Sequence, residues 1–175
     1  MHTLTRLETC AAAIAVVLSP AVTSATFAII KAGADPGAND ATRVALDPDL
    51  RRCDFSLVTT VTPTPRSRLG TGLALIHTAG SRAIAEVHLV DAPDPGTHFD
   101  VGLIQEPRSS SGTCGPGDPG TAFTGMDTDG AGSGTVTVQD TIRPGTTGVW
   151  VIIERPDANS QNPAEFYASE FVAPV

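Results

Sequence analysis

The residues with the clearest potential for chemistry are His88, His98 and Asp100, which lie on two stretches of alternating apolar and polar residues, 82–90 and 98–105. If these stretches pair as a hairpin that is symmetric about its loop, His88 faces Asp100 across the strands and His98 lies diagonally beside them. Directly opposite side chains on one face of a sheet lie ~5 Å apart, and diagonal ones ~7 Å. Imidazole and carboxylate groups at that spacing suit zinc or copper. The spacing therefore allows a small metal or redox site on this hairpin.

The same face has a simpler interpretation as a solvent-exposed polar surface. A cross-strand pair of His88 and Asp100 would stabilise a sheet by less than about 1 kcal/mol. Three metal ligands would also need one particular register, and register slips easily in a hairpin with a long loop. We therefore predict no bound metal and no cofactor, and keep His88, His98 and Asp100 as metal candidates only.

A second acidic motif begins at Asp127 and resembles the start of a calcium loop, because Asp129 follows two residues later and a glycine comes next. The motif departs from that pattern at the third acidic position, where Ala131 stands, and at its end, where Val138 replaces the bidentate glutamate. Only two carboxylates remain. We predict a glycine-rich connection between two strands here, which needs no metal.

Three cysteines are present, and Cys10 precedes an apolar run near the amino terminus. If that region is removed as a leader, Cys53 and Cys114 remain, and an even pair in an exported chain predicts a disulfide. Closing a loop of this length would stabilise the fold by roughly 4 kcal/mol. The alternative is a reactive thiol at Cys114, but a nucleophilic cysteine needs a base or a cationic neighbour, and no histidine lies close in the sequence.

The sequence contains no recognisable catalytic signature. The serines at 109–111 do not belong to a G-x-S-x-G elbow, and no histidine stands near them in the sequence. We therefore predict that the protein is not an enzyme and has no catalytic residues.

The elements that must position all these residues are short strands. The stretches 82–90 and 98–105 show the period of two that half-buried strands have, separated by a loop with two prolines and a glycine. About eight short strands, with no helical stripe of three turns outside the leader, predict an all-β fold, a single antiparallel β-sandwich that is Ig-like or a related Greek key. The residues predicted to face inward on the hairpin are Ala85, Val87, Leu89, Phe99, Val101 and Leu103. The other predicted strands are 27–31, 53–61, 69–78, 121–126, 134–142, 147–154 and 165–172.

One predicted strand and one loop stand out. Residues 148–153 read GVWVII, which predicts a strand buried on both faces with Trp150 as the largest core side chain. The loop 106–120 is rich in glycine and proline, and a loop of this length in a compact domain needs a restraint or a function. A bond from Cys114 to Cys53 supplies the restraint. Recognition residues concentrate on loops of rigid scaffolds, so the predicted contact surfaces are the loops at 91–97, 106–120 and 155–164.

Residues 1–25 are predicted to be a signal peptide, because Arg6 precedes the apolar run 11–18 and small residues follow it. The run is too short to cross a bilayer as a helix, which needs ~20 residues, so no membrane insertion is expected after cleavage. An irregular arm is predicted at 26–49, where Ala, Asp, Gly and Pro show no period, and the β-sandwich domain at 50–175.

Charge narrows the range of partners. The chain carries 11 basic and 19 acidic residues, for a formal net charge of −8. Nucleic acids and anionic membranes are bound through clustered basic faces, whereas the basic residues here are scattered. We predict no nucleic-acid partner.

A family resemblance rests on the order of several segments. These are VHLVDAPDPGTHFDVGLIQ, a cysteine in a Gly-Pro loop, TDGAGSGTVTV, GVWVIIERP and a terminal EFYASEFV. In this order the chain resembles small exported β-sandwich proteins of actinobacteria. The resemblance implies a fold and a compartment, and it implies no activity.

Together these features predict a secreted, non-enzymatic binding or interaction module with an unidentified extracellular or cell-envelope partner. The alternative is a small metal-binding or redox protein that uses His88, His98 and Asp100. Metal content of the purified protein distinguishes the two.

Overall fold

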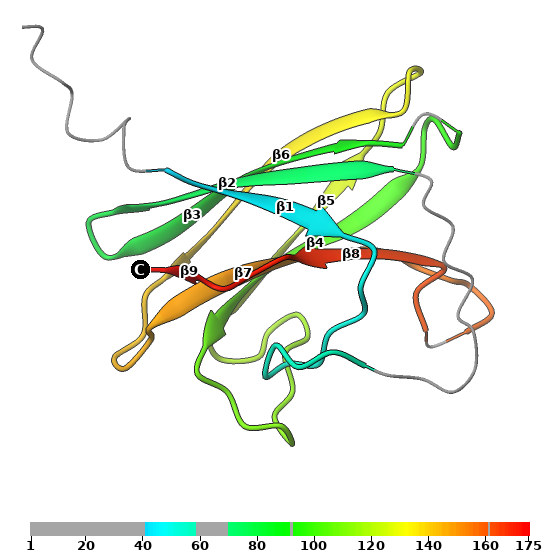
Figure 1. Ribbon diagram of the computed structural model, residues 1–175. Helices are drawn as coiled ribbons and strands as arrows, with labels where there is room; N and C mark the ends of the chain where they lie inside the picture. The colour runs from blue at the N-terminus through cyan, green and yellow to red at the C-terminus, as the bar shows by residue number, and fades with distance from the viewer. Residues whose placement is uncertain (1–40, 59–69, 92, 161) are drawn as a thin grey trace, which may run out of the picture. The chain divides into compact units, whose positions relative to one another are not determined.

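The computed structural model describes residues 41–58, 70–91, 93–160 and 162–175. These residues form nine strands in one antiparallel sheet with the order β5-β4-β7-β8-β1-β2-β3-β6, while β9 pairs with β7 beside this path (Figure 1). The strands are β1 (Thr42–Asp47), β2 (Thr71–Ala79), β3 (Arg82–Val90), β4 (His98–Glu106), β5 (Thr121–Asp127), β6 (Ser133–Thr141), β7 (Gly148–Arg155), β8 (Glu165–Ser169) and β9 (Ala173–Pro174). The predicted all-β fold is confirmed.

The sheet closes almost completely into a barrel. Strands β5 and β6 stand at the two ends of the strand order, and they lie against each other as neighbours in sequence. A sheet whose edges meet in this way has one enclosed interior, whereas a sandwich has two separate sheets facing each other. The predicted β-sandwich is therefore wrong, because alternation along each strand marks an inward face and does not distinguish the two architectures.

The interior is filled by the inward side chain of every second strand position. On β3 the residues Ala83, Ala85, Val87 and Leu89 have no exposed surface, while Glu86 and the other residues at even positions point partly or fully to solvent. All six residues predicted to face inward on the two central stretches are fully buried: Ala85, Val87, Leu89, Phe99, Val101 and Leu103.

The two central strands do not pair with each other. The strand β3 pairs with β2 and β6, and β4 pairs with β5 and β7. The connection at 91–97 instead runs past the turn between β5 and β6, where the backbone N–H groups of Asp91 and Gly96 donate hydrogen bonds to the carbonyl oxygens of Gly132 and Asp129. The predicted hairpin is therefore wrong in its pairing and correct in its strands, because a connection of this length allows the chain to reach a non-adjacent strand.

Two other segments differ from expectation. Residues 42–47, predicted as part of an irregular arm, form β1 between β2 and β8, with Val44 and Leu46 buried. Residues 53–58, predicted as a strand, form a tight turn closed by a bridge between Arg51 and Leu57. Flanking Gly, Pro and Asp residues hide the alternation of the first segment, whereas the apolar residues of the second pack outside the barrel. Residues 26–40 of the predicted arm, which include the predicted strand at 27–31, lie outside the described residues, as do residues 59–61 and the predicted signal peptide at 1–25.

A second apolar cluster covers the outer face of β7 beside the barrel core. Trp150 is fully buried there, and Phe55 packs against it edge to face with ring centroids 5.6 Å apart. The indole Nε1 donates a hydrogen bond of 2.9 Å to Oε1 of Glu106. Since Val149 and Val151 point into the barrel core, β7 is buried on both faces, as the run at 148–153 predicts.

The disulfide between Cys53 and Cys114 is confirmed. It joins the turn that carries Phe55 to the loop after β4, so it holds the two segments that cover Trp150. Within the described part of the chain, there is no apolar helix of the length needed to cross a membrane.

We expect replacement of both Cys53 and Cys114 by alanine to lower the free energy of unfolding by about 3–4 kcal/mol, because the bond links residues 61 positions apart and restricts the unfolded chain. Urea denaturation measures the change. Reducing agent should destabilise the unmodified protein by a similar amount and leave the double variant unaffected. Equal stability of the oxidised protein and the double variant would contradict this role.

Candidate functional site

The structure separates the histidines that the sequence suggested as metal candidates. His88 lies on β3 between Leu73 and Thr135 of its neighbouring strands, and its Nδ1 is 3.1 Å from Oγ1 of Thr135. It lines a shallow groove of about 530 Å³ on the outer face of the sheet, together with Arg43 and Glu170. Because β3 and β4 are not paired, His88 does not face Asp100.

His98 and Asp100 do lie close together, on β4. The Nδ1 of His98 is 2.7 Å from Oδ1 of Asp127, and its Nε2 is 3.6 Å from Oδ1 of Asp100. The hydrogen bond to Asp127 raises the pKa of His98 and outweighs the opposing effect of burial, and the charges of Asp127 and Asp100 raise the pKa further. The arrangement is a partly exposed imidazole held between two carboxylates.

The calcium-like motif uses its acids for contacts within the chain. Asp127 accepts the bond from His98, and Oδ1 of Asp129 accepts backbone hydrogen bonds from Ala131 and Ser133 at 2.8 and 2.9 Å. These backbone donors lower the pKa of Asp129. The motif is thus the tight turn between β5 and β6.

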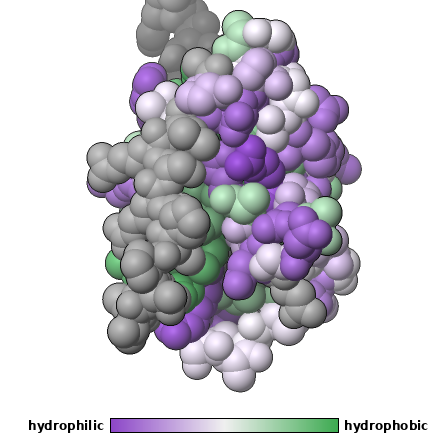
Figure 2. Space-filling view, turned by 90° about the vertical axis from the view of Figure 1, so that its right-hand side faces the viewer, coloured by the Kyte–Doolittle hydropathy of each residue, from purple (hydrophilic) through white to green (hydrophobic). Residues whose placement is uncertain are grey.

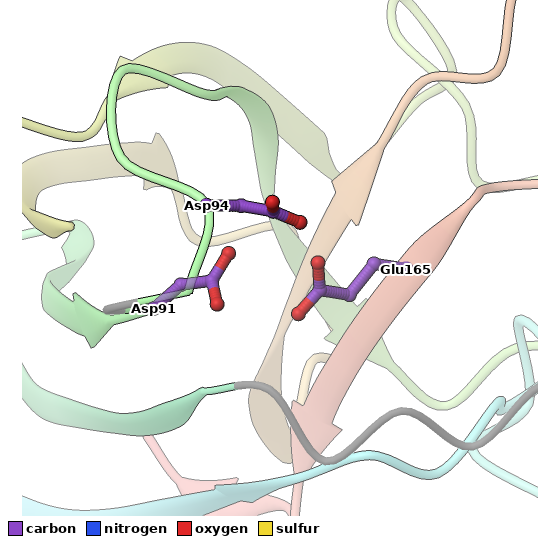
Figure 3. Close-up of side chains that lie close together, drawn as sticks. All are labelled: Asp91, Asp94 and Glu165. Atoms are coloured by element: carbon purple, nitrogen blue, oxygen red, sulfur yellow. The ribbon is translucent and has the colours of Figure 1, made fainter.

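A different group of acids gathers at one end of the barrel, and we call Asp91, Asp94 and Glu165 the acid cluster. One carboxylate oxygen from each residue lies within 4.8 Å of those from the other two, and the three groups point toward one another (Figure 3). Asp91 follows β3 and is fully buried, Asp94 lies in the connection to β4 and is half-buried, and Glu165 begins β8 and is 4% exposed. The outer surface of this end of the barrel is largely hydrophilic (Figure 2).

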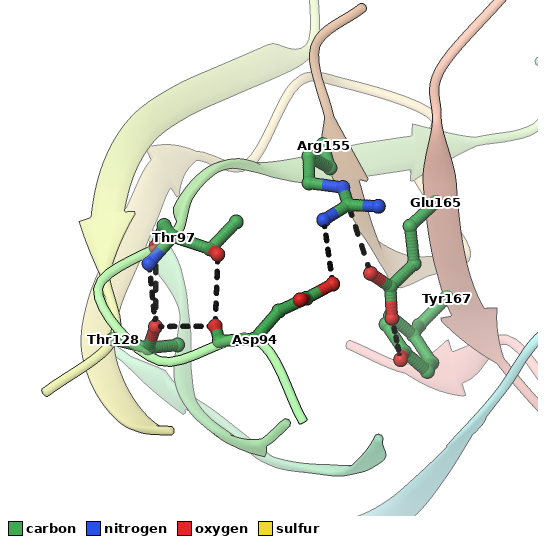
Figure 4. Close-up of polar contacts among 6 residues, drawn as sticks. All are labelled: Asp94, Thr97, Thr128, Arg155, Glu165 and Tyr167. Atoms are coloured by element: carbon green, nitrogen blue, oxygen red, sulfur yellow. Dashed lines mark hydrogen bonds and ion pairs between the residues drawn. The ribbon is translucent and has the colours of Figure 1, made fainter. Parts of the chain in front are cut away.

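Two side chains from the neighbouring strands orient the acid cluster (Figure 4). The Nη1 of Arg155 on β7 is 2.9 Å from Oδ2 of Asp94, and its Nε is 3.7 Å from Oε2 of Glu165. The hydroxyl of Tyr167 donates a hydrogen bond to Oε1 of Glu165. Glu165 is therefore held at one oxygen by a neutral donor, and its other oxygen faces Arg155 and the two aspartates.

Threonines fix the connection that carries Asp94. The Oγ1 of Thr97 donates a hydrogen bond of 2.8 Å to the carbonyl oxygen of Asp94, and the backbone N–H of Thr97 donates one of 2.9 Å to Oγ1 of Thr128 (Figure 4). Thr128, which follows β5, is 5% exposed. These bonds tie the connection to the turn between β5 and β6, so the position of Asp94 is set by the fold.

Asp91 is the exceptional member of the acid cluster. Both of its carboxylate oxygens are buried, and neither has a hydrogen-bond partner among the described residues. Burial raises the pKa of Asp91, the negative charge of Asp94 raises it further, and Arg155 opposes the shift. Burial likewise raises the pKa of Glu165 against the opposing hydrogen bond from Tyr167. Such a group of hard oxygen donors can hold a proton between carboxyl groups or bind a hard cation.

None of the three acids of the cluster is among the site residues that the sequence predicts, although one signal for them is present. Asp91 continues the inward alternation of Ala85, Val87 and Leu89, so it stands at a buried position of β3 extended by one residue. Glu165 lies two residues before the buried Tyr167 and shares its face. A charged residue at an inward position is a signal for a functional site. The sequence does not indicate, however, that the end of β3 and the start of β8 lie close together in the barrel.

The second candidate surface is the loop after β4, residues 107–120, which we call the clamped loop. Arg108, near its start, donates hydrogen bonds to the carbonyl oxygens of Gln105, Thr113, Pro119 and Gly120 at 2.5 to 3.1 Å. The disulfide at Cys114 ties the loop to the turn of residues 51–57. The serines at 109–111 are exposed at its surface. A long loop is thereby held in one conformation.

No family model, curated protein or solved structure matches this chain. The resemblance to small exported proteins of actinobacteria accordingly stays a prediction. The geometry of the acid cluster and of the clamped loop is what supports a function.

The contact between His98 and Asp127 gives a first prediction for this region. We expect Asp127→Asn to lower the pKa of His98 toward its ordinary value of 6.5, because the substitution removes both the charged acceptor and its negative charge. Titration of the imidazole protons by nuclear magnetic resonance measures the shift. Asp100→Asn serves as the matched control and should lower the pKa of His98 by less, and a larger effect of Asp100→Asn would contradict the assignment.

A second prediction concerns the pH dependence of stability in metal-free buffer. Because the pKa of Asp91 is raised in the folded protein, its contribution is most favourable below the unfolded value of 3.8 and is lost as pH rises through the folded pKa. Asp91→Asn cannot ionise, so it should be more stable than the unmodified protein at about pH 7 and lose less stability between about pH 4 and about pH 8. Urea denaturation across this range provides the measurement.

Asp129→Asn is the control with the opposite sign, since backbone donors lower the pKa of Asp129 and its contribution is present at neutral pH. It should leave the protein less stable than the unmodified chain at about pH 7. Parallel stability curves for the unmodified protein and Asp91→Asn would show that Asp91 carries no desolvation penalty.

Proposed function

We propose that the protein is an exported, non-enzymatic binding module that contacts an extracellular or cell-envelope partner through the clamped loop. The observation that carries the proposal is the fixation of this loop by Arg108 and by the disulfide at Cys114. A loop that is already ordered loses little conformational entropy on binding, so its contacts contribute more fully to affinity. Recognition residues are commonly placed on loops that a rigid scaffold positions.

The composition of the clamped loop indicates the chemistry of the partner. Its charged side chains are engaged within the loop, because Arg108 binds backbone carbonyls and Asp118 accepts a hydrogen bond of 2.8 Å from the N–H of Gly115. The exposed residues carry no charge: they are the serines at 109–111 and Thr113, which present hydroxyl groups, and Pro107, Pro116, Gly117 and Pro119. Such a surface fits a polar, uncharged partner that is held by hydrogen bonds. Its binding should depend little on ionic strength.

The expected compartment is consistent with this role. A structural disulfide is typical of oxidising environments outside the cytoplasm, and the bond between Cys53 and Cys114 is one. The alternative of a metal-binding or redox protein built on His88, His98 and Asp100 receives no support from the geometry. His88 is on a strand that does not neighbour β4, and His98 is engaged by Asp127.

The test compares two variants that each remove three exposed hydroxyl groups. Replacement of the serines at 109–111 by alanine should reduce binding to cell-envelope fractions of the source organism by about tenfold or more, since each lost hydrogen bond contributes about 0.5–1.5 kcal/mol. The matched control replaces Thr78, Ser81 and Thr137, which are exposed away from the clamped loop, and should bind like the unmodified protein.

Quantitative sedimentation with the envelope fraction measures retention of the oxidised protein at low and at high salt. Retention of the unmodified protein that is equal at both salt concentrations agrees with the uncharged surface. The proposal fails if the unmodified protein is not retained, or if the two triple variants are retained equally.

A further inference from the structure

We propose that the acid cluster of Asp91, Asp94 and Glu165 binds one hard divalent cation, for which Ca²⁺ is the best match, at the end of the barrel where β3 ends and β8 begins. The proposal is independent of the clamped loop, because the acid cluster belongs to the connection between β3 and β4 and to β8. Four observations carry it: an unpartnered buried carboxylate, the local charge, the spacing of the oxygens and the way in which they are held.

The unpartnered carboxylate is that of Asp91. It has no exposed surface, its two oxygens have no hydrogen-bond partner among the described residues, and it points into the acid cluster. A buried ionised group without a partner is strongly unfavourable, and native proteins satisfy such groups by pairing them or by coordinating a metal. Among the described residues, Arg155 is the cation at the acid cluster. Its guanidinium lies close to the carboxylates of Asp94 and Glu165. A ligand that supplies positive charge would therefore satisfy Asp91.

The local charge matches a divalent ion. Three carboxylates and the guanidinium of Arg155 leave two negative charges when all four groups are ionised, and a divalent cation neutralises them. The donors are all hard oxygens, which suit Ca²⁺ and Mg²⁺ and do not suit the soft ions that cysteine or imidazole selects. The all-oxygen donor set thus points to a hard divalent cation such as Ca²⁺ or Mg²⁺.

The spacing of the oxygens is compatible with Ca²⁺, and the irregular donor set favours it over Mg²⁺, which requires near-ideal octahedral geometry. Ca²⁺ binds oxygen at about 2.3–2.6 Å, so ligands on opposite sides of it are about 4.6–5.2 Å apart, whereas the same separation around Mg²⁺ is about 4.0–4.2 Å. One oxygen from each acid lies within 4.8 Å of the others, which is compatible with a shared Ca²⁺ without closure of the acid cluster. Tyr167 and Arg155 each engage one carboxylate oxygen, so four of the six remain for the ion, and water can supply the other ligands of a Ca²⁺ that accepts six to eight in irregular geometry.

Besides Arg155, two of the acids are held by uncharged groups that would not compete with the ion. Tyr167 binds Oε1 of Glu165 and leaves Oε2 toward the aspartates, and Thr97 fixes the backbone of Asp94. A site whose ligands are positioned before the ion arrives loses less entropy on binding. Thr97, Thr128 and Tyr167 are therefore positioning residues.

The competing interpretation is that the carboxyl groups share a proton and bind no cation. Burial raises the pKa of Asp91 and of Glu165, which is compatible with either ligand because both are positively charged. The two interpretations differ in their response to calcium at a pH where the carboxyl groups are largely ionised. They also differ in what Asp91→Asn does. If the acid cluster binds a cation, the substitution removes a metal ligand and weakens calcium binding. If the carboxyl groups only share a proton, it relieves desolvation and leaves no calcium binding to lose.

The experiment titrates CaCl₂ into the purified, oxidised protein in metal-free buffer and follows heat and thermal unfolding. We expect one site with a Kd of about 0.1–1 mM, the range of extracellular calcium modules. Calcium at about ten times Kd should raise the Tm by about 3–5 °C. Mg²⁺ at the same concentration should give a smaller shift.

Asp91→Asn and Glu165→Gln should each weaken calcium binding by at least about tenfold, because each removes one of three charged ligands. Without calcium at about pH 7, Asp91→Asn should be more stable than the unmodified protein, which separates loss of a ligand from loss of the fold. Glu86→Gln removes one exposed carboxylate on β3 and is the matched control, with unchanged affinity.

Terbium luminescence gives a measurement that needs no variant. Tyr167 is the only tyrosine of the chain and contacts Glu165, so excitation of its ring should sensitise emission of Tb³⁺ bound in place of Ca²⁺. Calcium should displace this signal. The proposal is overturned if the unmodified protein shows neither calcium heat, nor a Tm shift, nor displaceable emission, or if Asp91→Asn retains the full Tm shift.

Discussion

Burial of β7 on both faces is the constraint on which the rest of the barrel depends. Its inward side chains fill the barrel core, and its outward side chains, with Trp150 at their centre, must be covered by segments from outside the sheet. The turn of residues 51–57 and the clamped loop supply that cover, and neither has a regular ladder to hold it. The disulfide between Cys53 and Cys114 joins the two covers to each other, so the outer cluster, the clamped loop and the apolar strand form one structural unit.

The acid cluster follows from another constraint, the separation of β3 from β4. Since β4 pairs with β5 at one edge of the sheet and β3 pairs with β6 at the other, their connection must cross the end of the barrel. That path places Asp91 at an inward position and brings Asp94 within reach of Arg155. The polar end of the barrel is thus a direct product of the strand order. Because β3 pairs with β6 and not with β4, His88 does not lie beside Asp100. The strand order therefore separates the predicted metal candidates and brings the acid cluster together.

The periodicity of the sequence was sufficient for the local structure and insufficient for the pairing. Alternation identified the inward residues of β3 and β4, and the apolar run around Trp150 identified the doubly buried strand, because both signals depend on residues close in sequence. Whether a sheet opens as a sandwich or closes as a barrel depends on contacts between β5 and β6 and on the partners of each strand, which period-two alternation does not encode. Alternation also predicts a strand around Phe55, where the structure has a turn, because the apolar residues of this turn pack in the outer cluster.

The energetics of the acid cluster argue for a role other than stability. Replacement of buried charged groups by apolar residues of similar volume is often neutral or stabilising, because desolvation offsets much of the attraction between the charges. Asp91 and Glu165 stand at inward positions that an aliphatic side chain would fill, next to a core made of such side chains. Arg155 offsets part of the charge and leaves Asp91 without a hydrogen-bond partner among the described residues. Departures from the apolar pattern of a core are expected at functional sites. The buried carboxylate of Asp91 is therefore best explained by a ligand that binds at this end of the barrel. A cation would supply the positive charge that the surrounding side chains do not give to Asp91.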